Sequence, residues 1–253
     1  MYGLCLLDLR HMNFSDDQKA HVVKQLQEHK RESGVRTIVL DEDANISIEL
    51  LIEQGVFASD VMSASVCLAR FLYKNRGLYQ GKDVVDIGCG PGTQGIVMAK
   101  YGARSVMMSD VNSKAVINTK KNIERYNLEN AIVIESDLFS DLPQNKTYDV
   151  IVFNHPFFAG NPSDFEEDSS KDEMLIRKSM LGGTELIGEF LKEAPKYLAH
   201  KGVIIMPYFH FAGIENDPAN RVEEYGLKIV DQHKEIAKKG AQLGEVSVYV
   251  ISV

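Results

Sequence analysis

Tryptophan is absent from the 253-residue sequence, and cysteine is scarce, with only three residues. Cys5, Cys67 and Cys89 are an odd number without paired spacing, which argues against a disulfide framework and indicates a reducing compartment. Long apolar runs are missing too, because no segment approaches the roughly 18 apolar residues of a membrane span. These absences predict a cytoplasmic protein that does not enter a membrane.

Positive charge is in deficit, with 28 Lys and Arg against 36 Asp and Glu and a formal net charge of −8. An acidic surface repels phosphate backbones, so nucleic acid is a possible partner only through a local basic patch. Lys120, Lys121 and Arg125 come closest to such a patch, although a plain solvated helix face explains them as well. The seven histidines lack metal-ligand spacing, and no metal site is predicted.

The order of helix and strand patterns from residue 57 onward is typical of an α/β fold. Helical spacing of apolar residues alternates with short apolar runs, which predicts a doubly wound, mostly parallel sheet with crossover helices. Seven strands are expected, at residues 84–87, 105–108, 131–134, 150–153, 203–206, 227–230 and 246–251. We therefore expect one domain over residues 57–253.

The first 56 residues are predicted to form a small α+β element that precedes this domain. Ser15 and Gln18 fit a capping box at the start of a helix that would run to Gly34. Residues 37–40 and 46–52 are expected to form the two short strands of a hairpin or lid. Such an element would help to cover a substrate.

A glycine-rich segment, residues 86–92, joins an expected strand to an expected helix. Glycines at such a turn let a ligand approach the backbone closely. The G-x-G-x-x-G spacing of dinucleotide sites is met only in the frame that starts at Gly90 and ends at Gly95. Within that frame Pro91 removes an amide that a pyrophosphate would bind, so a nicotinamide-dependent oxidoreductase is disfavoured but stays open.

The fuller spacing of the segment, Asp86-x-Gly88-x-Gly90-x-Gly92, resembles the first motif of class I S-adenosylmethionine-dependent methyltransferases, and four motifs of that family, this one included, occur in order. The resemblance covers most of residues 57–253 and implies a Rossmann-like sheet whose last strand is antiparallel. It also implies S-adenosylmethionine as the cofactor. The cofactor-binding residues that it implies are Phe57, Asp86, Gly88, Cys89, Gly90, Gly92, Asp110, Val111, Asp137, Leu138 and Asn154.

Each implied contact has a chemical reason. The amino group of the methionine part is cationic and needs an acceptor such as Asp86. Asp110 would accept both ribose hydroxyls, with Val111 beside it, while Asp137 would accept from the adenine amine and Leu138 would cover the ring. The alternative is that the glycines only make a tight turn and the aspartates cap helices.

The segment Asn154-His155-Pro156-Phe157 is similar to the Asn-Pro-Pro-Tyr/Phe motif of methyltransferases that act on planar nitrogens, namely the glutamine amide of release factors and adenine amino groups. A conjugated nitrogen is a poor nucleophile, so the site has to hold it in line with the methyl group. The resemblance implies that the Asn154 side chain and the His155 carbonyl accept its hydrogen bonds while Phe157 stacks on the substrate. The predicted catalytic residues are Asn154, His155, Pro156 and Phe157.

His155 departs from that motif, because the family has its first proline there. The backbone carbonyl is kept, but the fixed φ of proline is lost. The imidazole could take up the proton released by methylation, read the substrate, or point away from the site and do nothing. All three interpretations stay open at this point.

Two further segments lie near the expected substrate entrance. Residues 57–65 resemble the loop that closes over cofactor and substrate in related enzymes, although Asp60, Ser63 or Ser65 would also serve as a helix N-cap. Residues 164–173 carry six acidic side chains and one basic one, which would repel phosphates.

The sequence therefore predicts an S-adenosylmethionine-dependent N-methyltransferase whose acceptor is a protein side chain or a small molecule. One alternative is a methyltransferase of RNA or DNA base amino groups, because a local basic groove is invisible in the total charge. A second alternative is a non-catalytic cofactor-binding or partner-stabilising subunit, in which His155 has spoiled the motif.

Overall fold

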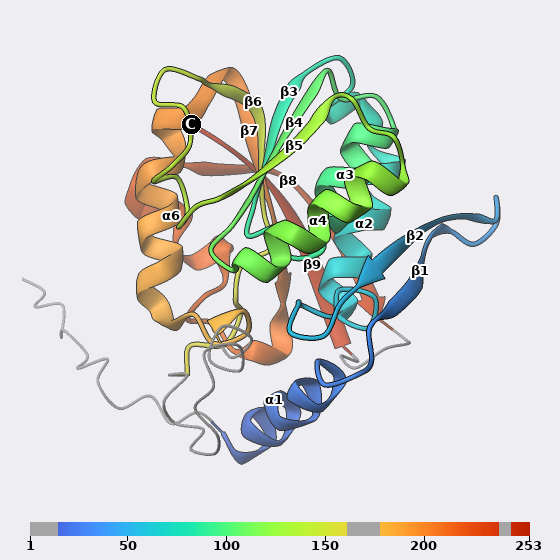
Figure 1. The fold of residues 1–253 in the computed structure, drawn as a ribbon. Coiled ribbons are helices and arrows are strands. Elements are labelled where there is room, and N and C mark those ends of the chain that lie inside the picture. Colours follow the sequence, from blue (N-terminus) through green and yellow to red (C-terminus); the bar gives the residue numbers. More distant parts are fainter. Residues whose placement is uncertain (1–14, 161–177, 238–243) are drawn as a thin grey trace, which may run out of the picture.

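The fold is organised around a central sheet, shown in Figure 1 for the computed structural model, which describes residues 15–160, 178–237 and 244–253. Seven strands form this sheet in the order β5-β4-β3-β6-β7-β9-β8. Their bounds are β3 Asp83–Ile87, β4 Ser105–Asp110, β5 Ala131–Glu135, β6 Tyr148–Phe153, β7 Leu198–Phe209, β8 Lys228–Ala237 and β9 Gly244–Ser252. Each of the seven segments expected from the sequence overlaps one of these strands, and only the segment 227–230 begins one residue before its strand, β8.

Strand direction follows the doubly wound pattern. The pairs β5–β4, β4–β3, β3–β6 and β6–β7 are parallel, whereas β9 is antiparallel to both β7 and β8. The expected mostly parallel sheet with a reversed last strand is thus confirmed. The strand order reverses direction between β3 and β6, and ligands of such sheets bind at the carboxyl ends of the strands beside this switch point.

Helices cover both faces of the sheet (Figure 1). They are α2 Ser63–Lys74, α3 Thr93–Lys100, α4 Ser113–Arg125 and α6 Gly183–Tyr197, with short 3₁₀ turns η2 Arg76–Leu78, η4 His210–Ala212, η5 Pro218–Asn220 and η6 Val222–Tyr225. Val85 and Ile151 pack into the cluster that contains α6 side chains, whereas Val84 and Val150 pack into the cluster of α2 and α3. This alternation follows from the two-residue period of a strand. None of the helices in the described ranges is long and apolar enough to cross a membrane.

The N-terminal elements are a helix, α1 Asp16–Glu28, and a hairpin of β1 Gly34–Asp41 and β2 Ile46–Ile52. The predicted capping box is confirmed, since Ser15 and Gln18 bond each other's backbone amides. The prediction that the helix continues to Gly34 is wrong. Gly34 already pairs with Ile52 in the hairpin, so the chain has to turn after Glu28.

The hairpin is fixed to the body of the protein. Asn118 and Asn122 of α4 bond the backbone of β2, each donating to the carbonyl of Leu51 at 2.8 Å. Ile48 and Leu50 lie in the same hydrophobic cluster as α2. The division of the chain at residue 56 stays a prediction.

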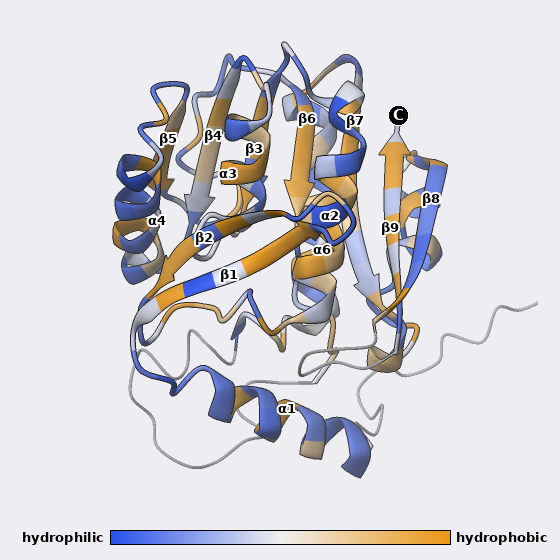
Figure 2. Ribbon diagram, turned by 90° about the vertical axis from the view of Figure 1, so that its right-hand side faces the viewer, coloured by the Kyte–Doolittle hydropathy of each residue, from blue (hydrophilic) through white to orange (hydrophobic). Residues whose placement is uncertain are grey.

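Helix α1 lies apart from the flanking helices. Figure 2 shows it, coloured mainly hydrophilic, below the end of the sheet toward which the arrowheads of β4 and β6 point. This end is the carboxyl edge, where the switch point places a ligand. The ring of His21 contacts the rings of Phe158 and Phe209, with centroids 5.9 Å and 5.6 Å apart. Val22 is completely buried in the α6-side cluster.

Close packing of α3 on the sheet generates a stability prediction. A Cβ added to Gly95 would overlap Sδ of Met108 and lie 2.5 Å from its Cγ. Met108 is fully buried, so its side chain has to shift within the packed core to admit the Cβ, and Gly95→Ala should lower the free energy of unfolding by about 1–3 kcal/mol in urea denaturation. Gly77→Ala is the matched control, because nothing lies within 4 Å of its added Cβ. Equal stability of the two variants would contradict this account.

Candidate active site

The turn between β3 and α3 is shaped by three glycines in the left-handed region. Gly88, Gly90 and Gly92 have φ values of 63°, 56° and 88°. L side chains rarely adopt this conformation, which explains the glycine at every second position. The amide of Gly90 donates to Oδ2 of Asp110 at 2.8 Å, so the turn is held against the end of β4.

Carboxylates lie at the carboxyl ends of neighbouring strands. Asp86, on β3, is almost completely buried, and its Oδ2 accepts from the Gly95 amide at 2.8 Å. Burial raises the pKa of Asp86 to about 7, the Gly95 bond opposes that shift, and the charge of Asp110 adds to it. The two oxygens of Asp110, on β4, accept from the amides of Gly90 and Asn112, and burial raises its pKa as well. Asp137, after β5, has an exposed side chain.

Other implied cofactor residues surround this edge. An added Cβ on Gly90 would lie 3.4 Å from Cβ of Phe57, so Phe57 rests against the glycine turn. Val111 exposes 50% of its surface, and Leu138 follows Asp137 with a φ of 47°. Cys89 is buried, with Sγ 3.8 Å from Oγ1 of Thr119, and burial raises its pKa. Cys89 therefore acts at least as a packing residue.

The loop of residues 57–65 docks on the glycine turn. Ser59 and Thr93 share a hydroxyl hydrogen bond of 2.7 Å, and Gln94 donates to the hydroxyl of Ser65 at 3.0 Å. The alternative that this loop supplies a side-chain N-cap is wrong, because α2 begins after Met62 without such a bond.

Asn154 follows directly after β6, which neighbours β3 in the sheet. Its Oδ1 is buried and has no hydrogen-bond partner within the described part of the chain. A buried amide oxygen without a partner is costly, and it is expected where a ligand completes the bond.

The side chain of His155 is buried, with 2% of its surface exposed. Its Nε2 donates to the carbonyl of Asn216 at 3.0 Å, and its ring stacks on Tyr208 with centroids 5.8 Å apart. Burial lowers the pKa of His155 to about 4, so the ring is neutral near pH 7. The ring anchors the loop through Nε2, and its Nδ1 is buried without a hydrogen-bond partner in the described part of the chain.

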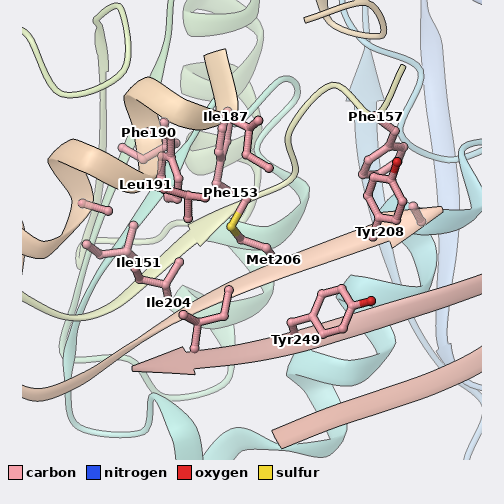
Figure 3. Close-up of a cluster of buried hydrophobic side chains, with 14 of the residues drawn as sticks. Ile151, Phe153, Phe157, Ile187, Phe190, Leu191, Ile204, Met206, Tyr208 and Tyr249 are labelled. Atoms are coloured by element: carbon pink, nitrogen blue, oxygen red, sulfur yellow. The ribbon is translucent and has the colours of Figure 1, made fainter. Parts of the chain in front are cut away.

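Phe157 lies behind the same loop. Figure 3 shows Phe157 and Tyr208 side by side at the carboxyl end of β7, and their rings meet edge to face at 5.6 Å and 83°. Phe157 exposes 8% of its surface, so most of the ring belongs to the core. Pro156 contacts the start of α6, since a Cβ added to Gly182 would lie 2.8 Å from Cβ of Pro156.

The remaining sequence predictions concern charge and metals. Lys121 pairs with Glu53 at 2.7 Å and Arg125 pairs with Glu49 at 3.0 Å, so these cations bind the hairpin. The acidic run of residues 164–173 lies outside the described residues. Among the residues that are described, no group of three His, Cys, Asp or Glu side chains is arranged to hold a metal ion.

Comparison with known proteins identifies the family. Residues 47–174 match the model of the methyltransferase small domain. The chain belongs to this family. It is an S-adenosylmethionine-dependent methyltransferase, which decides against the dinucleotide-dependent oxidoreductase.

The names of this methyltransferase's relatives indicate different methyl acceptors. A candidate protein N5-glutamine methyltransferase of Methanocaldococcus jannaschii is 32% identical over 165 residues, 62% of this chain and 77% of that protein. A ribosomal protein L11 methyltransferase of Thermosipho africanus is 30% identical, with 68% of this chain and 55% of that protein covered. A ribosomal RNA small subunit methyltransferase C of Aliivibrio fischeri is 31% identical, with 65% and 41% covered. The chain thus spans about half the length of the last two.

A solved structure shows the same fold. The 16S rRNA N2 G1207 methyltransferase of T. thermophilus, in complex with S-adenosylmethionine and guanosine, superposes with a TM-score of 0.58 at 20% identity. The match covers 87% of this chain and 50% of that chain.

The buried imidazole of this methyltransferase gives a pH prediction. Unfolded His155 takes up a proton as the pH falls below 6.5, whereas in the folded state it does so only near pH 4. Wild-type stability should therefore fall by up to about 3 kcal/mol relative to His155→Gln between pH 6.5 and pH 4, measured by urea denaturation. Exposed His200→Gln is the control. A pH-independent difference between wild type and His155→Gln would show that the ring is solvated.

Proposed function

We propose that this methyltransferase methylates a planar amide or amino nitrogen of a protein side chain or small molecule, with Asn154 positioning that nitrogen. The observation that carries the proposal is the buried, unpartnered Oδ1 of Asn154 at the carboxyl end of β6, one strand from the glycine turn. An amide oxygen held there accepts a hydrogen bond from an N–H donor. The segment after β6 thus has the acceptor that a weakly nucleophilic nitrogen needs.

The cofactor residues fit their chemical task. S-adenosylmethionine, when bound, supplies a methyl group on positively charged sulfur, and its amino and hydroxyl groups are hydrogen-bond donors. The proposed partners of these donors are the carboxylates of Asp86, Asp110 and Asp137, which are acceptors only when ionised. Val111 and Leu138 offer apolar surface for the adenine ring, and Phe57 closes the turn.

Catalysis in this proposal depends on position and not on a strong base. The Asn154 oxygen and the His155 carbonyl accept the N–H bonds of the nitrogen and direct its lone pair at the methyl group. S-adenosylmethionine would supply the methyl group to this nitrogen, with the electron pair of the S–C bond left on sulfur. The nitrogen then releases its proton to water. This step does not require the His155 ring, because its pKa of about 4 makes its free Nδ1 a weak base.

The class of acceptor follows from charge. The net charge of −8 and the pairing of Lys121 and Arg125 with glutamates favour a protein or small-molecule acceptor. Methylation of an RNA base amino group is the second candidate, favoured by the match to the ribosomal RNA methyltransferase of A. fischeri. We also propose a cytoplasmic location, from the three cysteines without paired spacing, and the domain boundary at residue 56.

Substitution of Asn154 tests the site. Asn154→Ala should lower kcat by roughly 10²–10³-fold, because one positioning acceptor is lost, and should leave the Kd for S-adenosylmethionine within about threefold. Transfer of labelled methyl groups into protein, RNA and small-molecule fractions of a cell extract measures activity and identifies the acceptor. Asn145→Ala, at an exposed position, is the matched control. Unchanged turnover of Asn154→Ala would remove Asn154 from the mechanism.

Asp86 generates a pH dependence of cofactor binding. Its carboxyl group, with a pKa of about 7, has to lose its proton to pair with a cationic amino group. The affinity for S-adenosylmethionine should therefore rise by up to about tenfold per pH unit as the pH increases toward 7, with proton release in calorimetry. Asp86→Asn should abolish this dependence, and exposed Asp141→Asn should keep it. Binding of the cofactor to the wild type without proton release would exclude the Asp86 contact.

A further inference from the structure

Helix α1 turns a polar face toward the carboxyl edge of the sheet. His21, Gln25 and His29 recur every fourth residue and therefore share one side of the helix. Gln25 is fully buried and His29 is 5% exposed, although glutamine and histidine usually reach solvent on a surface helix. The sequence analysis expected the N-terminal element to help cover a substrate, and these three residues lie on the side of α1 that faces inward.

Contacts at the two ends of this face place it between the cofactor turn and the Asn154 segment. At one end the ring of His29 lies 5.3 Å from that of Phe57, which rests against Gly90. At the other end His21 packs on Phe158, four residues after Asn154. Gln25 is bonded to both histidines, through its side chain to His21 and through its carbonyl to His29, and so lies between these two contacts.

Buried acceptors on this face lack partners. Gln25 donates from Nε2 to Nε2 of His21 at 2.7 Å, which leaves its Oε1 buried without a hydrogen bond in the described ranges. Nδ1 of His29 contacts the carbonyl of Gln25 at 2.7 Å, and because a carbonyl only accepts, Nδ1 carries the proton. Nε2 of His29 is then a bare acceptor, also buried and unpartnered.

The charge state of His29 agrees with this assignment. Burial lowers the pKa of His29 to about 4, so the ring stays neutral and its Nε2 lone pair stays available near pH 7. Arg31, just beyond the helix, pairs with Asp60 at 2.7 Å and fixes the end of α1 to the loop of residues 57–65. A ligand that satisfies these acceptors has to present N–H or O–H groups.

We propose that the inner face of α1 is part of the acceptor subsite, where Gln25 Oε1 and His29 Nε2 bind N–H donors of the group to be methylated. This proposal rests on the proposed function and adds a specificity element to it. Together with Asn154, three neutral acceptors would surround the substrate nitrogen group. Such a subsite selects a carboxamide or amino group, with several N–H donors, over a carboxylate or phosphate, which only accept.

The test uses variants that remove each acceptor with little change in shape. In Gln25→Leu and His29→Phe, the KM for a blocked peptide with one central glutamine should rise about fivefold, since each variant loses one hydrogen bond to a neutral acceptor. The Kd for S-adenosylmethionine and S-adenosylhomocysteine should stay within twofold. Gln27→Leu, on the exposed side of the same helix, should change neither value. If the labelling assay with the cell extract marks RNA, guanosine and an RNA fraction are used as substrates in place of the peptide.

The possible outcomes show whether the two acceptors bind N–H groups of the substrate or of the cofactor. A rise in KM with unchanged cofactor Kd, at an unchanged urea midpoint, supports the subsite. A weaker cofactor Kd with unchanged KM would assign the two acceptors to the cofactor and overturn the proposal. No change in either value would overturn it as well. Loss of activity in Asn154→Ala alongside normal kinetics in both α1 variants would leave the proposed function standing without this subsite.

Discussion

The parallel pairing of β3 with both β4 and β6 is the constraint on which the site depends. Three carboxyl ends meet at one edge, and the connections that leave them diverge to opposite faces of the sheet. Asp86, Asp110 and Asn154 are brought together by this geometry alone, although 68 residues separate the first from the last. The bond from the Gly90 amide to Asp110 then fixes the turn against the neighbouring strand.

The side chains named at this edge of the sheet are mainly hydrogen-bond acceptors. Carboxylates, an unpartnered amide oxygen and neutral imidazoles all lie there, and burial disfavours the charged form of each ionisable group among them. A cationic ligand with many N–H and O–H groups reverses this penalty, whereas a phosphate would increase it. The proposed site thus suits a ligand rich in hydrogen-bond donors, and the proposed acceptor subsite on α1 has the same chemistry.

The sequence predicted those features of the fold that depend on the pattern of neighbouring residues. Strand positions, the capping box of Ser15 and the residues at the carboxyl edge all follow from spacing within one strand, turn or helix. The position of α1 does not, because it rests on contacts such as that of Gln18 with the carbonyl of Phe211, 193 residues away. The end of α1 was missed for a similar reason, since pairing of Gly34 with Ile52 decides where the helix has to stop.

His155 shows how a tertiary contact replaces a local one. Proline stiffens a loop through its own ring, independently of the rest of the fold. Here the loop is held by a hydrogen bond to the carbonyl of Asn216 and by stacking on Tyr208, both supplied by the segment that follows β6 by more than 50 residues. The position of the His155 carbonyl is therefore coupled to β7 and to the chain beyond it. A family motif that loses a proline at this position keeps its acceptor geometry only where the fold provides such an anchor.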